Sequence, residues 1–139
     1  MVAFPSVGRM MVERSSAMDK AKIALIEDVE SNRLVFGMYL EDAGHEIVVE
    51  ATNLGEALAV VDGIADGIHE VDVVLLDGNL QPETDTYDDA RAVAERIKER
   101  GVSAVVIGFS LGSLNEKGIP VHADTYKSHK KLLEIIRAL

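Results

Sequence analysis

The stretch Val71–Asp77 reads VDVVLLD, an apolar run that ends in a carboxylate. Most of its apolar residues follow one another instead of alternating with polar ones, a pattern typical of a strand covered on both faces. Such strands occur in parallel sheets packed between helices. The stretch therefore predicts a buried strand of an α/β domain, and the segments on either side should alternate between strand and helix.

The rest of the sequence alternates in this way from Lys22 onward. The predicted strands are Lys22–Glu27, Glu46–Glu50, Val71–Asp77, residues 103–110 and residues 123–127. Apolar residues at helical spacing predict helices over Glu30–Ala43, from Thr52 as N-cap to Ile64, over Ala90–Arg100, and from Ser128 as N-cap onward. This order predicts one open parallel sheet with helices on both faces.

The first predicted helix carries an apolar stripe. Leu34, Val35, Met38 and Tyr39 recur at helical spacing, which predicts the helix, and Met38 is expected to lie in the core. Gly44 follows the helix and is expected to end it as a C′ residue.

The segment between the fourth and fifth predicted strands leaves little room for a helix. It contains Gly112, Gly118 and Pro120, and in a helix interior Gly costs about 1 kcal/mol and Pro about 3 kcal/mol relative to Ala. The sequence therefore predicts that the helix between the fourth and fifth strands, called the fourth helix below, is short or missing.

Composition limits the possible functions. The chain has 139 residues, which suits one domain, and 47% of them are hydrophobic. The absence of cysteine excludes disulfides and thiolate metal sites. A net charge of −10 argues against nonspecific binding to nucleic acid, which needs cationic side chains on phosphate. No apolar run approaches the about 20 residues of a membrane-spanning helix, so no membrane partner is expected.

Residues 1–20 do not share the strand and helix patterns. They lack the continuous apolar core of a signal peptide, and Met10, Met11 and Met18 are all possible later starts. We expect a poorly ordered N-terminal extension ahead of a domain over residues 21–139, and a cytoplasmic location.

Polar side chains follow four of the five predicted strands. Glu27 and Asp28 follow the first, Asp77 ends the third, Ser110 ends the fourth and Lys127 ends the fifth. Ligands of an open parallel sheet bind at the carboxyl ends of its strands, so these side chains should meet. Three carboxylates in one crevice repel one another unless a cation lies between them, and Mg²⁺ prefers such oxygen ligands. A hydroxyl and an ammonium nearby suit a phosphoryl group, with Asp77 as its nucleophile.

In this order the pieces resemble the receiver domain of response regulators, the CheY-like phosphoacceptor of two-component signalling. They are the acid pair after IALI, the Asp after DVVLL, the hydroxyl after VVIGF and the Lys of TYKS, and the resemblance covers Ala21–Leu139. It implies a five-stranded sheet in the order 2-1-3-4-5. It also implies a partner, either a sensor histidine kinase or a histidine phosphotransfer protein, and an unknown downstream target. No enzymatic activity is implied beyond the domain's own phosphorylation and dephosphorylation.

The resemblance also implies a role for each residue. Asp77 would accept the phosphoryl group, while Asp28, Glu27 and the backbone carbonyl of Asn79 would bind Mg²⁺ together with it. The other two side chains that follow strands would contact the phosphoryl group: Lys127 would pair with it, and Ser110 would be the switch hydroxyl.

Several positions depart from the family pattern. Leu111 follows the switch hydroxyl where a small residue is usual, Ser128 follows the lysine where proline is usual, and Pro82 falls one place late. The usual position of the switch aromatic holds Asp124, so Tyr126 is a possible substitute because alternate residues of a strand share a face.

Two other functions fit the same residues less well. One is an interaction module that keeps the fold without being phosphorylated, which Leu111 and Ser128 favour. The other is a phosphatase of the haloacid-dehalogenase type, but Asn79 stands where its general acid would be. The four histidines are expected to be structural or solvated, since no two are spaced as a ligand pair: His45, His69, His122 and His129.

Overall fold

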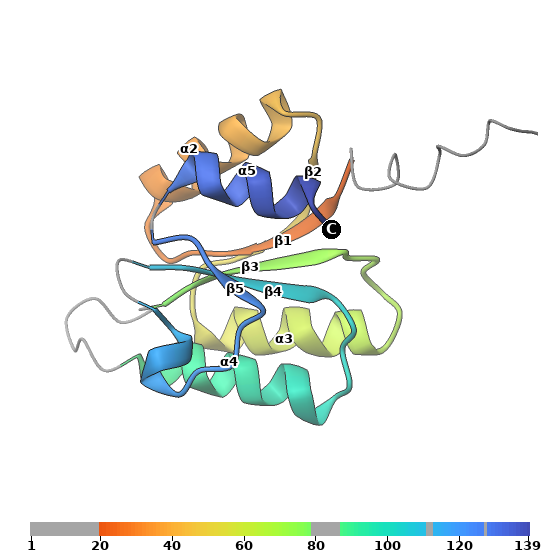
Figure 1. Ribbon diagram of the computed structural model, residues 1–139. Helices are drawn as coiled ribbons and strands as arrows, with labels where there is room; N and C mark the ends of the chain where they lie inside the picture. Colours follow the sequence, from red (N-terminus) through yellow and green to blue (C-terminus); the bar gives the residue numbers. More distant parts are fainter. Residues whose placement is uncertain (1–19, 79–86, 111–112, 127) are drawn as a thin grey trace, which may run out of the picture.

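The computed structural model describes residues 20–78, 87–110, 113–126 and 128–139. Strands and helices alternate along the chain, as the sequence predicts (Figure 1). The strands are β1 (Lys22–Ile26), β2 (Glu46–Ala51), β3 (Val73–Asp77), β4 (Val105–Phe109) and β5 (Ala123–Asp124). The helices are α2 (Glu30–Asp42), α3 (Leu54–Ala65), α4 (Asp88–Glu99), α5 (His129–Arg137) and the 3₁₀ turn η3 (Asn115–Lys117).

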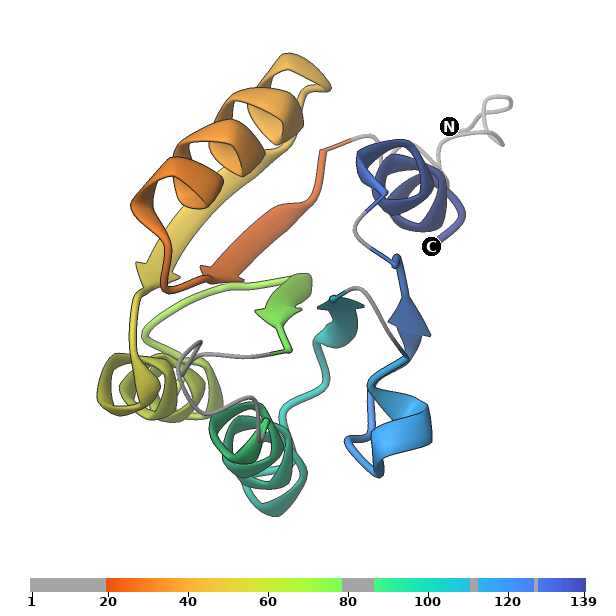
Figure 2. The ribbon, with the colours of Figure 1, turned by 90° about the vertical axis from the view of Figure 1, so that its left-hand side faces the viewer.

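The five strands form one parallel sheet in the order β2-β1-β3-β4-β5. This confirms the predicted fold class and strand order. β3 pairs with both β1 and β4, so the stretch VDVVLLD lies at the centre of the sheet. Because all strands are parallel, their carboxyl ends share one edge, which faces the viewer in Figure 2.

Two helical layers cover the sheet, with α2 and α5 on one face and α3 and α4 on the other (Figures 1 and 2). Successive residues of the central strand enter opposite cores: Val74 and Leu76 pack toward α3 and α4, while Val73 and Leu75 pack toward α2 and α5. Both faces of the strand are therefore buried, which explains its nearly unbroken run of apolar residues.

Helix ends follow the sequence with one correction. Gly44 after α2 and Gly101 after α4 have positive φ angles of 96° and 65°, as expected of residues that end a helix. The prediction that Thr52 is the N-cap of α3 is wrong, because Asn53 accepts the hydrogen bond from the Glu56 amide at 2.9 Å. Thr52 instead donates its amide and hydroxyl to the Glu56 carboxylate, which lowers the pKa of Glu56.

The prediction that Met38 of α2 lies in the core is also wrong, since it is 66% exposed. Phe36 and Leu40 are the buried residues of this helix. The four residues of the predicted stripe are exposed instead: Leu34 61%, Val35 52%, Met38 66% and Tyr39 38%. Consequently α2 presents an apolar outer surface that the fold does not cover.

The short connection between β4 and β5 confirms the prediction of a stunted fourth helix. Over residues 113–126 the only helical element is η3, which is three residues long. Leu114 is fully buried beneath it, and Asp124 accepts hydrogen bonds from the Leu114 amide (2.9 Å) and the Ser113 hydroxyl (2.8 Å). The segment is thus held by specific contacts although it forms almost no helix.

β5 is shorter than the sequence predicts. It ends at Asp124, and Tyr126 has a left-handed backbone with a φ of 55°. The chain therefore leaves the strand before Tyr126, and Ser128 then caps α5 by accepting from the Lys131 amide, as predicted. Within the described ranges, every helix is too short or too polar to cross a membrane. The expected extension over residues 1–20 lies outside the described residues except for Lys20.

Candidate functional site

Three carboxylates meet at the carboxyl edge of the sheet. Glu27 and Asp28 follow β1, and Asp77 is the last residue of β3. Glu27, Asp28 and Asp77 can each place one oxygen within 4.8 Å of the others, and no other such acid or histidine group occurs in the described parts of the chain. Glu27 and Asp77 are buried, with 1% and 7% of their surfaces exposed, while Asp28 is half-buried.

Strand register is what brings these residues together. Ile26 of β1 is paired with Leu76 of β3, so Glu27, which follows Ile26, lies beside Asp77, which follows Leu76. The Glu27 amide also donates to the Ala51 carbonyl at 3.0 Å, which holds the acid pair at the strand end. The acidic cluster is therefore fixed by the same backbone pairing that builds the sheet.

The first turn of α2 supports the cluster. One oxygen of the Glu27 carboxylate accepts from the Val29 amide at 3.2 Å and lies 3.5 Å from the Asn32 side-chain amide. Arg33 donates from Nη1 to the Glu27 carbonyl at 2.9 Å, while its Nε lies 3.5 Å from a Glu50 carboxylate oxygen. Sequence reasoning missed Asn32 and Arg33, although their position one turn into the helix after the acid pair could have pointed to them.

Ser110 lies beside the residue that follows Asp77. Asp77 is paired with Phe109, the last residue of β4, so Ser110 and Gly78 come next on neighbouring strands. A Cβ placed on Gly78 would be 2.7 Å from the Ser110 Cβ. Ser110 is 4% exposed, so its hydroxyl belongs to the same buried edge as the acidic cluster.

The chain resembles solved structures more clearly than it resembles known sequences. No protein-family model and no curated protein matches it. The chemotaxis protein CheY4 of Vibrio cholerae is 22% identical, over 86% of this chain and 98% of that chain, with a TM-score of 0.62. The response regulator TrrA of Thermotoga maritima, solved with Mg²⁺ and BeF, is 20% identical over 85% of this chain and 97% of that chain, with a TM-score of 0.66.

A third solved structure is the receiver domain of the histidine kinase CKI1 from Arabidopsis thaliana, in complex with Mg²⁺. It is 23% identical over 85% of this chain and 90% of that chain, with a TM-score of 0.66. The chain has the receiver-domain fold. At these identities the similarity concerns the fold, and the chemistry of the site depends on the residues themselves.

Three residues at the predicted receiver site lie outside the described residues. They are Asn79, with its expected carbonyl ligand, Lys127, the expected phosphoryl-binding cation, and Leu111, the bulky residue after Ser110. On either side of position 127, Thr125 is fully buried and donates its hydroxyl to the Gly108 carbonyl at 3.1 Å, and the Ser128 amide donates to the Thr125 carbonyl at 3.0 Å.

Tyr126 does not occupy the face of β5 that the sequence suggested. Because β5 ends at Asp124, the two-residue alternation of a strand does not extend to Tyr126. Tyr126 is 49% exposed, and the centroid of its ring lies 4.8 Å from the Lys131 ammonium. Asp124, at the usual position of the receiver aromatic, instead bonds to Ser113 and Leu114.

Three of the four histidines have clear structural contacts. The Nδ1 atom of His45 accepts from the Ala21 amide at 3.0 Å, and Nδ1 of His122 accepts from the Val106 amide at 2.8 Å. His129, at the start of α5, lies against the rings of Phe36 and Phe109, with centroids 5.1 and 5.4 Å away. These contacts confirm that the three histidines are structural.

Proposed function

We propose that this protein is a phosphoacceptor receiver, in which Asp77 takes a phosphoryl group from a phosphohistidine on a sensor kinase or histidine phosphotransfer protein. The observation that carries the proposal is the gathering of Glu27, Asp28 and Asp77 within 4.8 Å at the carboxyl edge of a receiver fold. Two proteins with the same fold, TrrA and CKI1, were solved with Mg²⁺, which supports the same cofactor here.

The donor set suits Mg²⁺. Glu27, Asp28 and Asp77 offer only carboxylate oxygens, the ligands that this hard cation prefers. When bound, the ion would offset the repulsion among these carboxylates and the charge of the phosphoryl group. Arg33 also contacts Glu27, but it donates to the backbone carbonyl of Glu27 and shares its charge with the Glu50 carboxylate.

The transfer itself is a displacement at phosphorus. A carboxylate oxygen of Asp77 attacks, the new O–P bond forms, and the P–N bond to the donor imidazole breaks. The imidazole leaves with the bonding electron pair and takes up a proton from solvent. We expect the Ser110 hydroxyl and the Lys127 ammonium to contact the transferred group, and hydrolysis of the aspartyl phosphate would restore Asp77. The protein would thus catalyse only its own phosphorylation and dephosphorylation.

The test is incubation with acetyl phosphate and Mg²⁺, followed by intact-mass measurement. The parent protein should gain one phosphoryl group that is lost on hydrolysis, and Asp77→Asn should gain none. Asp42→Asn, which changes an exposed carboxylate at the far end of α2, should behave as the parent does. Phosphorylation of the Asp77→Asn protein would show that another residue is the acceptor.

A second function, an interaction module that is not phosphorylated, is favoured by Asp124. This residue ties down the β4–β5 connection through Ser113 and Leu114 instead of supplying a switch aromatic. If neither acetyl phosphate nor a phosphohistidine protein labels the parent chain, the interaction module becomes the better assignment. Steady hydrolysis of small phosphomonoesters would instead favour the phosphatase.

A further inference from the structure

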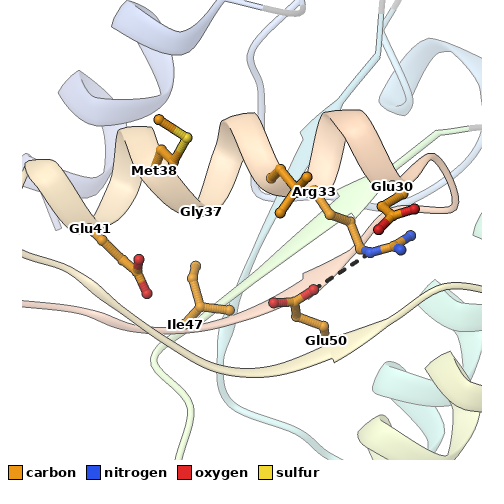
Figure 3. Close-up of a pocket in the computed structure, with 8 residues that line it drawn as sticks. Glu30, Arg33, Gly37, Met38, Glu41, Ile47 and Glu50 are labelled. Carbon is orange, nitrogen blue, oxygen red and sulfur yellow. Dashed lines mark ion pairs between the residues drawn. The ribbon is translucent and has the colours of Figure 1, made fainter.

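A groove lies between α2 and the edge strand β2. It extends along most of the helix, from Glu30 in the first turn to Glu41 near the end. Figure 3 shows Glu41 and Ile47 at one end and Arg33, Glu30 and Glu50 at the other. The volume of the groove is about 310 Å³. It opens on the β2 side of α2, whereas Phe36 and Tyr39 lie on the side that meets His129 of α5.

Half of the residues that line this groove are apolar, and the two large ones on α2 are exposed. Leu34 and Met38 are one turn apart on α2 and are among its most exposed residues, at 61% and 66%. Ile47 lines the same groove from β2. Large apolar side chains that are grouped and exposed mark an interaction surface more often than isolated ones do.

The rim of the groove is acidic. Glu30 and Glu41 stand on α2 at opposite ends, and no residue in the described part of the chain pairs with either carboxylate. Glu50 is the third acid, and only it has a partner, the Nε of Arg33 at 3.5 Å. Glu41 is eleven positions after Glu30, so their backbones lie about 16 Å apart along the helix. The apolar residues of the groove therefore lie between acidic side chains at its two ends.

We propose that the α2–β2 groove is a docking site for a basic segment of another protein, with apolar side chains between cationic ones about 16 Å apart. A second copy of this chain is a poor occupant because it would bring the same carboxylates together, on a chain of net charge −10. Pairing of a strand with the β2 edge is opposed by the charges of Glu46 and Glu50 on that strand and by the register shift that skips Val48. Side-chain complementarity is therefore the basis of recognition.

The test uses two short synthetic peptides and the ¹⁵N-labelled full chain. One peptide has lysines at both ends and leucine and serine between them, and the other has glutamates in place of the lysines. The lysine peptide should shift the amide resonances of Leu34, Met38 and Ile47, and its affinity should fall with added salt. The glutamate peptide should bind at least tenfold more weakly.

Variants of the protein test whether the lysine peptide binds this groove or responds only to the overall negative charge of the chain. The double variant Glu30→Gln with Glu41→Gln, and separately Met38→Ser, should each lower the affinity for the lysine peptide at least tenfold. All three side chains are exposed, so the fold should be retained. The matched control is Glu95→Gln with Glu99→Gln, two exposed acids one turn apart on α4, which should leave the affinity unchanged.

Three outcomes of the peptide experiments would overturn the docking site. They are equal binding of the two peptides, equal losses in the α2 and α4 variants, and resonance shifts centred away from α2 and β2. Self-association of the parent chain that Met38→Ser abolishes would show a second copy in the groove and would also overturn the proposal.

Discussion

Leu114, in the connection between β4 and β5, packs directly against Gly78, the residue that follows Asp77. A Cβ placed on Gly78 would lie 2.7 Å from Leu114 Cδ2, and one placed on Gly108 would lie 2.8 Å from Leu114 Cδ1. The fully buried Leu114 side chain thus fills the space that two glycines leave open. This contact joins the edge of the sheet that carries Asp77 to the segment that replaces the fourth helix.

Gly78→Ala should therefore destabilise the protein. The added methyl group would overlap both Leu114 and Ser110, and overpacking of this kind costs about 1–3 kcal/mol. The measurement is the free energy of unfolding in urea. As a control, Gly37→Ala adds a methyl group inside α2 where no atom beyond its chain neighbours and the adjacent helix backbone lies within 4 Å, so it should be neutral or stabilising.

Leu114→Ala tests the same contact from the other side. Alone it should cost about 2–5 kcal/mol because it empties a fully buried site. Combined with Gly78→Ala it should cost less than the sum of the two single changes, since the smaller side chain gives the new methyl group room. Additive losses would mean that Leu114 and Gly78 do not share this space.

Asp124 should hold the β4–β5 connection in place. It accepts from the Leu114 amide and from the Ser113 hydroxyl, so Asp124→Ala would leave both donors without their acceptor. A loss of about 1–3 kcal/mol is expected, together with faster hydrogen exchange of the Leu114 amide. Asp124→Asn keeps one side-chain oxygen and should lose less. Identical exchange in all three proteins would contradict this role.

The link between α3 and α4 should depend on pH. The hydrogen bond from Arg96 lowers the pKa of Asp62, and the charges of Arg96 and Arg100 add to the effect. Since the folded-state pKa is depressed, the stabilisation is present above the unfolded value of about 3.9 and is lost as the pH falls through the folded value. The melting temperatures of the parent and Asp62→Asn should differ most near neutral pH and converge in acid. A constant difference would show that the charge of Asp62 is not the cause.

The strands and the acidic cluster follow from local sequence. Apolar runs such as VDVVLLD identify strands buried on both faces, and the parallel order brings Glu27, Asp28 and Asp77 to one edge. That Glu27 and Asp77 lie on neighbouring strands depends in addition on the strand order, which the family resemblance implied and the register of β1 with β3 confirms.

The exposed face of α2 and the role of Asp124 did not follow from sequence. In α2 the stripe containing Leu34 and Met38 repeats at the same helical spacing as Phe36 and Leu40, and spacing alone does not say which of two stripes faces the sheet. The bonds from Asp124 to residues ten and eleven positions earlier depend on how the β4–β5 connection folds. The left-handed backbone of Tyr126 likewise has no signal in its residue type.

Metal removal tests the acidic cluster directly. Without a cation, Glu27, Asp28 and Asp77 crowd like charges, so Mg²⁺ should raise the melting temperature. At a hundredfold excess over the dissociation constant the gain in unfolding free energy is about 2.7 kcal/mol. Asp28→Ala should remove this dependence, whereas Asp42→Ala should keep it. An unchanged melting temperature of the parent across millimolar Mg²⁺ would count against the metal site.

The last prediction concerns what phosphorylation does to assembly. In this chain the described part of the β4–β5 connection contains only η3, and Leu114 and Asp124 hold that connection against the sheet. A long fourth helix that could rearrange into a dimer surface is therefore missing from residues 113–126. We expect the protein to remain monomeric when beryllofluoride and Mg²⁺ mimic the phosphoryl group, as measured by light scattering, with Asp77→Asn as the unreactive control. A doubling of the mass in the parent but not in Asp77→Asn would show that this shortened connection still supports phosphorylation-driven dimerisation.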